Sequence, residues 1–145
     1  MNDTPFNRAT DTLLIVDDIA PIRELYRDVA EDAGYAVLEA DCPSSMSAAL
    51  EASTPTLILL DLTLPEADGL ELLRDLARVE FSGPVILASG QDQEMIATAQ
   101  RFGSMLGLDL PLTLTKPISV NTISTLLDDF RQTSDSTSVS GSLSA

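Results

Sequence analysis

The chain has 145 residues, 44% of them hydrophobic, and this size predicts one domain with a single core. Its 8 basic and 23 acidic residues give a formal charge of −15, which excludes direct binding to nucleic acid or to anionic membranes as an expected function. The chain has no histidine, which excludes histidine catalysis, and its single cysteine excludes an internal disulfide. It also lacks the apolar run of about 18 residues that a membrane span requires, so we expect a cytoplasmic protein.

Short apolar runs alternate with segments of helical periodicity, which predicts an α/β fold around a parallel sheet. In chain order we expect a strand at 12–17, a helix with a core stripe of Ile22, Leu25, Tyr26, Val29 and Ala33, a strand at 36–40, a helix at 44–52, a strand at 56–61, a helix at 70–79, a strand at 84–89, a helix at 94–102, a strand at 110–115 and a helix at 120–130. Gly34 should end the first helix. The second strand is short and mixed in polarity, so we expect it at an edge of the sheet.

The two ends of the chain differ in composition from the part between them. Residues 132–145 contain eight Ser or Thr among fourteen residues and little that a core would bury. This composition predicts a flexible tail or linker after a domain at residues 11–131. We expect residues 1–10 to be a flexible N-terminus.

Charged and polar residues follow the ends of four predicted strands. Asp17 and Asp18 close the first strand, Asp61 the third and Ser89 the fourth, and Lys116, the only lysine, follows the fifth. Ligands of an open parallel sheet bind beyond the carboxyl ends of its strands, so we expect these side chains to meet there. Taken singly, Asp17 and Asp18 are also typical helix N-caps, and Ser89 is a common turn residue.

The chemistry of this set favours phosphoryl transfer. Three neighbouring carboxylates repel one another, and a magnesium ion with its preference for oxygen ligands would relieve that repulsion. Lys116 then supplies a positive charge to an incoming phosphoryl group, and the Ser89 hydroxyl donates a hydrogen bond to it. Asp61 remains as the nucleophile.

Four ordered motifs carry a resemblance to a known family: LLIVDD at 13–18, LILLDLTLPEADGLELL at 57–73, VILASG at 85–90 and TKP at 115–117. Within the second motif, Asp61, Pro65 and Gly69 have the spacing of that family. From about residue 11 to 130 the chain resembles the receiver domains of two-component response regulators. The resemblance implies a flavodoxin-like, doubly wound, five-stranded parallel sheet in the order 2-1-3-4-5, with five helices.

The resemblance also implies a role for each matching residue. Asp61 would be the phosphoacceptor, Asp18, Asp61 and the backbone carbonyl of Thr63 would hold Mg²⁺, Asp17 would act mainly through water, Ser89 would be the switch hydroxyl, and Lys116 would pair with the phosphoryl group. The family further implies a cis peptide between Lys116 and Pro117.

The expected function is that of a signalling switch in a phosphorelay, not of an enzyme beyond slow self-dephosphorylation. Because the chain has no histidine, the phosphoryl group would come from a histidine kinase, a histidine phosphotransfer protein or a small phosphodonor. The output would be an attached domain or a partner protein, and homodimer formation is left open.

Three alternatives to this interpretation are open. The segment 91–115, with GSMLGLDLP, is longer than usual and resembles receivers joined to cyclic-di-GMP phosphodiesterase domains, so the chain would be one part of a larger regulator. Haloacid-dehalogenase phosphatases also use a strand-end aspartate, but they need a second aspartate where this chain has Thr63. An interaction module with an inactive pocket is the third alternative, against which the complete set of acidic residues and the lysine argue.

Overall fold

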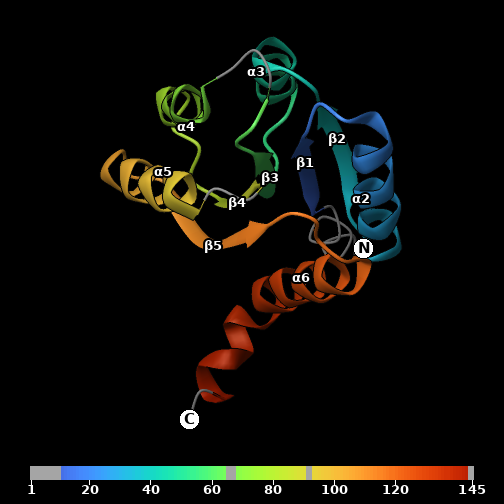
Figure 1. Cartoon of the computed structure of the whole chain (residues 1–145). Coiled ribbons are helices and arrows are strands. Elements are labelled where there is room, and N and C mark those ends of the chain that lie inside the picture. Colours follow the sequence, from blue (N-terminus) through green and yellow to red (C-terminus); the bar gives the residue numbers. More distant parts are fainter. Residues whose placement is uncertain (1–10, 65–67, 91–92, 144–145) are drawn as a thin grey trace.

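The computed structural model describes residues 11–64, 68–90 and 93–143, and the side chains of this part as far as Arg131. In these residues five strands alternate with five helices (Figure 1). The order is β1 (Thr12–Val16), α2 (Ala20–Asp32), β2 (Ala36–Ala40), α3 (Pro43–Ala52), β3 (Leu57–Asp61), α4 (Gly69–Arg78), β4 (Pro84–Ser89), α5 (Gln93–Met105), β5 (Asp109–Thr115) and α6 (Val120–Leu143). The predicted alternation of strands and helices is confirmed.

The sheet is parallel throughout and has the strand order β2-β1-β3-β4-β5. Its three central strands, β1, β3 and β4, are buried almost along their whole length, as their apolar sequences predict. β2 lies at one edge, which confirms its predicted position, and β5 lies at the other. The doubly wound sheet in the order 2-1-3-4-5 is therefore confirmed.

Helices cover both faces of the sheet, with α3, α4 and α5 on one side and α2 and α6 on the other (Figure 1). Side chains along a strand alternate between the faces. In β1, Leu14 and Val16 face the first group of helices, whereas Leu13 and Ile15 face the second. The sheet thus separates two cores, and the prediction of a single core is wrong because both faces of a doubly wound sheet are covered by helices. The two cores fix the strands from both sides, so that their carboxyl ends are held at one edge.

Helix α2 shows where the sequence prediction was correct and where it failed. Tyr26 is buried, but Leu25 has 40% of its surface exposed, so its predicted place in the core is wrong. Ala30, which was not part of the predicted stripe, is fully buried. At 100° per residue, a stripe through Tyr26 and Ala30 leaves Leu25 beside the buried face. Gly34 follows the helix at a φ of 95°, which confirms the predicted end.

The later elements differ in length from the prediction. α5 and β5 include most of the segment that was predicted to be a long connection, which leaves only residues 106–108 between them. α6 continues beyond residue 130 to Leu143, into the segment predicted as a tail, whose flexibility stays a prediction. Residues 1–10 and Pro65 lie outside the described residues. Among the described helices, none combines the length and the apolar character that a membrane crossing requires.

Candidate functional site

All five predicted strand-end residues lie at the carboxyl edge of the sheet. Asp17 and Asp18 follow β1, Asp61 ends β3, Ser89 ends β4, and Lys116 follows β5. The backbone holds these ends in place, because the Lys116 N–H donates to the carbonyl of Ser89 at 2.7 Å. On the other side, the Asp17 N–H donates to the carbonyl of Ala40 at 3.0 Å. The peptide bond between Lys116 and Pro117 is cis, as predicted.

The three aspartates form one acidic cluster. Asp17, Asp18 and Asp61 each offer a carboxylate oxygen, and these oxygens lie within 4.8 Å of one another. Asp17 and Asp61 are only 2% and 3% exposed, so water screens them poorly. At an effective dielectric constant near 20, each pair of charges at this separation repels by roughly 3 kcal/mol. Such a cluster needs positive charge close by.

Lys116 supplies part of this charge. Its Nζ donates to Asp17 Oδ2 at 2.7 Å and to Asp61 Oδ2 at 3.0 Å. The lysine side chain is itself mostly buried, with 16% of its surface exposed. Burial lowers the pKa of Lys116, but its hydrogen bonds to Asp17 and Asp61 and their negative charges outweigh burial and raise the pKa above its ordinary value. The ammonium form is therefore favoured.

Each of the two buried carboxylates also accepts hydrogen bonds on its other oxygen. Asp61 Oδ1 accepts from the Thr63 N–H at 2.9 Å and from the Thr63 hydroxyl at 2.6 Å. Asp17 Oδ1 accepts from the Ile19 N–H at 2.9 Å. Both carboxylates are thereby fixed in rotation. For Thr63, this contact through N–H and hydroxyl was not predicted, and the metal-binding role of its carbonyl stays a prediction.

The Ser89 hydroxyl, at the end of β4, is buried without a hydrogen-bond partner in the described part of the chain. Its hydroxyl is fully buried and is the one buried side-chain oxygen or nitrogen of the described residues that has no hydrogen-bond partner. An unpaired buried hydroxyl costs about 1–3 kcal/mol. A hydroxyl that is left unpaired at a strand end can donate its hydrogen to an acceptor oxygen of a ligand bound at this edge of the sheet.

The helix-cap alternative for the acidic pair is not supported. The N-cap residue of α2 is Ile19, and no side chain caps this helix end. The backbone N–H that bonds to the Asp17 carboxylate is that of Ile19, which precedes the first residue of the helix. Asp17 and Asp18 are instead two members of the acidic cluster.

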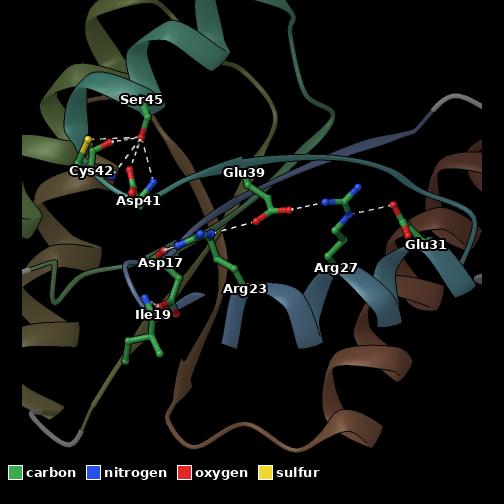
Figure 2. A network of polar contacts seen from close by, with 9 residues as sticks. All are labelled: Asp17, Ile19, Arg23, Arg27, Glu31, Glu39, Asp41, Cys42 and Ser45. Atoms are coloured by element: carbon green, nitrogen blue, oxygen red, sulfur yellow. Dashed lines mark hydrogen bonds and ion pairs between the residues drawn. The ribbon is translucent and has the colours of Figure 1, made fainter. Parts of the chain in front are cut away.

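Sequence reasoning missed two residues of α2 that reach the site. The Arg23 guanidinium donates through Nη1 to the backbone carbonyl of Asp17 at 2.8 Å (Figure 2). Tyr26 is buried and feels the charges of the cluster: burial raises the pKa of its phenol, the charge of Lys116 opposes this rise, and the charges of Asp17 and Asp61 add to it. Arginine in the first turn of a helix is unfavourable to the helix dipole, and this signal could have indicated that Arg23 has a partner.

The residues present fit a divalent cation. Three carboxylates and one ammonium group leave the cluster with two uncompensated negative charges. The ligand atoms available are carboxylate oxygens, which Mg²⁺ prefers, and the partly exposed Asp18 leaves the cluster accessible from solvent. Asp17, Asp18 and Asp61 are the residues that would hold such an ion.

Comparison with known proteins assigns the family. Residues 13–128 match the family model of the response regulator receiver domain. The chain belongs to this family. The receiver is 44% identical over 85 residues to the phosphate regulon transcriptional regulatory protein PhoB of Pseudomonas aeruginosa, which covers 57% of this chain and 37% of PhoB. It is 29% identical over 94 residues to the chemotaxis protein CheY of Bacillus subtilis, which covers 63% of this chain and 78% of CheY.

Solved structures agree with this assignment. The receiver domain of NtrX from Brucella abortus aligns with a TM-score of 0.71 and 27% identity over 83% of this chain and 98% of that chain. A response regulator from Colwellia psychrerythraea aligns with a TM-score of 0.71 and 27% identity over 84% of this chain and 97% of that chain. The receiver covers less than half the length of the PhoB, PhoP and KdpE relatives it matches. Family membership favours a signalling protein over the phosphatase alternative.

Proposed function

We propose that the receiver accepts a phosphoryl group on the carboxylate of Asp61 in a Mg²⁺-dependent reaction, and that this modification switches its contact with a partner protein or output domain. One observation carries the proposal: the buried Asp61 is hydrogen-bonded to the only lysine of the chain, beside two further carboxylates. The unpartnered hydroxyl of Ser89 supports a ligand with free acceptor oxygens at the same place.

The transfer step is a displacement at phosphorus. A carboxylate oxygen of Asp61 forms the new O–P bond while the bond from phosphorus to the donor atom breaks, and the donor leaves with the electron pair. Lys116 neutralises charge on the phosphoryl oxygens, and Ser89 donates its hydroxyl hydrogen to one of them. A Mg²⁺ ion held by Asp17, Asp18, Asp61 and the Thr63 carbonyl would add positive charge to those oxygens.

The phosphodonor must come from outside the chain. The receiver contains no histidine that could carry a phosphoryl group, so we propose a histidine kinase or a histidine phosphotransfer protein as the partner. A small phosphodonor would serve the same reaction in vitro. The receiver would take up one phosphoryl group per molecule and would not turn over phosphate esters repeatedly.

The test is phosphorylation by a small phosphodonor with Mg²⁺, read by intact-protein mass spectrometry. We expect the wild type to gain one phosphoryl group, and the Asp61→Asn variant to gain none because an amide cannot displace the donor. Asp41→Asn is the matched control: Asp41 follows β2 at the same edge of the sheet but is exposed and hydrogen-bonded to Ser45, outside the acidic cluster. Modification of Asp61→Asn at the wild-type level would disprove the proposal.

A further inference from the structure

Arg23 connects the acidic cluster to the edge strand of the sheet. Its Nη1 donates to the carbonyl of Asp17 at 2.8 Å, and its Nε donates to Glu39 Oε1 of β2 at 3.0 Å (Figure 2). Only 17% of the Arg23 side chain is exposed. A planar guanidinium with two bonded partners in different elements has little rotational freedom, so these contacts define its position.

The carbonyl that Arg23 holds belongs to the peptide unit between Asp17 and Asp18. Fixing this peptide unit sets the direction in which the next side chain, that of Asp18, leaves the backbone. Asp17 has two other anchors, Lys116 and the N–H of Ile19. The contacts found for the described residues give the Asp18 carboxylate no hydrogen bond or ion pair, although it is a member of the cluster. The backbone therefore has to position Asp18.

Arg27 provides a natural comparison on the same helix. Its Nη1 donates to the other oxygen of Glu39 at 2.8 Å, and its Nε donates to Glu31 at 3.1 Å (Figure 2). Both arginines thus pair with Glu39, and each of them carries one positive charge on α2. Of the two, only Arg23 has a hydrogen bond to Asp17.

We propose that Arg23 is a positioning residue for metal binding: by fixing the Asp17–Asp18 peptide unit it orients the Asp18 carboxylate toward the Mg²⁺ position, and Glu39 holds Arg23 in place. This inference rests on the proposed function, because it assumes that the cluster binds Mg²⁺. Partners that orient metal ligands without touching the metal typically change metal affinity by about 10–100-fold when they are lost.

The test is titration of the receiver with MgCl₂ by calorimetry, without any phosphodonor. We expect Arg23→Gln to weaken Mg²⁺ binding by about 10-fold or more. Arg27→Gln removes the same charge from the same helix, and because the Arg27 side chain is 48% exposed and has no hydrogen bond to Asp17 we expect a change of less than about 2-fold. Glu39→Gln, which loosens Arg23 without removing it, should give a smaller loss in the same direction.

The sign of the effect separates positioning from simple charge. If Arg23 only offset negative charge, Arg23→Gln would bind Mg²⁺ more tightly, because the cluster would become more negative. Affinity at or above the wild-type level, or equal losses in Arg23→Gln and Arg27→Gln, would therefore overturn the inference. Absence of Mg²⁺ binding in the wild type would instead overturn the proposed function and this inference with it. Should Arg23→Gln fail to fold, Arg23→Lys decides, because it keeps the positive charge but loses the planar two-partner contact: weaker Mg²⁺ binding would support positioning, and wild-type affinity would overturn the inference.

Discussion

The two edges of the sheet differ in how completely their polar side chains are paired. At the carboxyl edge, three carboxylates share one ammonium group, and the Ser89 hydroxyl has no partner. At the amino edge, by contrast, the polar side chains are bonded to backbone carbonyls. Tyr35 Oη donates to Leu127 O at 2.8 Å, and Arg131 Nη1 donates to Ala33 O at 2.6 Å.

This difference indicates that the amino edge contributes to stability and the carboxyl edge to ligand binding. The amino edge ties α6 to the end of α2 with satisfied hydrogen bonds, which stabilise the folded state. The carboxyl edge keeps electrostatic repulsion and an unpaired hydroxyl, which a ligand would relieve. Substitutions at the carboxyl edge should therefore affect phosphorylation, and substitutions at the amino edge should affect the stability of the folded state.

Among substitutions that leave the Asp61 carboxylate in place, Lys116→Met should have the largest effect on the rate of phosphorylation. Within the part of the chain that the structure describes, it removes the one cation that is bonded to both Asp17 and Asp61. Loss of one charge-stabilising donor typically lowers a rate by ~10²–10³-fold. The measurement is the rate of phosphoryl uptake from a small phosphodonor at saturating Mg²⁺. Arg131→Met, which removes a cation from the amino edge, should leave this rate within about 2-fold of the wild type. Similar losses in both variants would contradict the division between the edges.

Gly34→Ala should have the largest effect on stability. Gly34 has a φ of 95°, and an added Cβ would collide with the Arg131 guanidinium. Strain at positive φ costs about 1–2 kcal/mol. Displacement of Arg131 from the Ala33 carbonyl would cost about 1 kcal/mol more. Urea unfolding measures the sum, and the phosphorylation rate of the folded variant should not change.

Gly107→Ala is the matched control for this prediction. Gly107 has a similar φ of 90°, but nothing lies within 4 Å of its added Cβ. It should therefore show the backbone strain alone, about 1–2 kcal/mol. Equal destabilisation in the two variants would mean that Arg131 adds nothing to the amino edge.

The sequence predicted the carboxyl edge better than the amino edge, for a physical reason. In a parallel sheet every strand ends at the same edge, so Asp61, Ser89 and Lys116 could be brought together from their positions after apolar runs. That rule uses only the order of strands and needs no knowledge of side-chain reach.

Contacts that depend on side-chain reach were missed. Tyr35 and Leu127 are separated by 92 positions, and no periodicity relates them. Arg23 occupies a polar position of α2, and its contact with Asp17 depends on the direction of a long side chain. Leu25 was placed in the core because it is hydrophobic, although it lies beside the buried stripe. The pattern of apolar runs therefore indicated which strand ends lie together, but not which side chains connect one element to another.

The smallest predicted effect concerns alkaline pH and Tyr35. Burial and the negative charges of Asp11 and Asp128, opposed by Arg131, raise the pKa of Tyr35 above its ordinary value of 10.0. A raised pKa means that the folded state holds the phenolic proton more tightly than the unfolded state. The resulting stability is fully present below pH 10 and is lost as the pH rises toward the folded-state pKa. Wild-type stability should therefore decline above pH 10.

Tyr35→Phe isolates this contribution. At neutral pH the variant should be less stable by about 1 kcal/mol because the bond to Leu127 is lost. Above pH 10 the difference from the wild type should narrow, because phenylalanine has no proton to lose. Tyr26→Phe is the corresponding variant near the acidic cluster. The pKa of Tyr26 is also raised, and we expect the stability difference between this variant and the wild type to narrow less above pH 10. Since the raised pKa of Lys116 acts in the same direction, both variants should keep part of the alkaline decline. A constant difference between Tyr35→Phe and the wild type across pH 10, measured by urea unfolding, would show that the Tyr35 proton does not contribute.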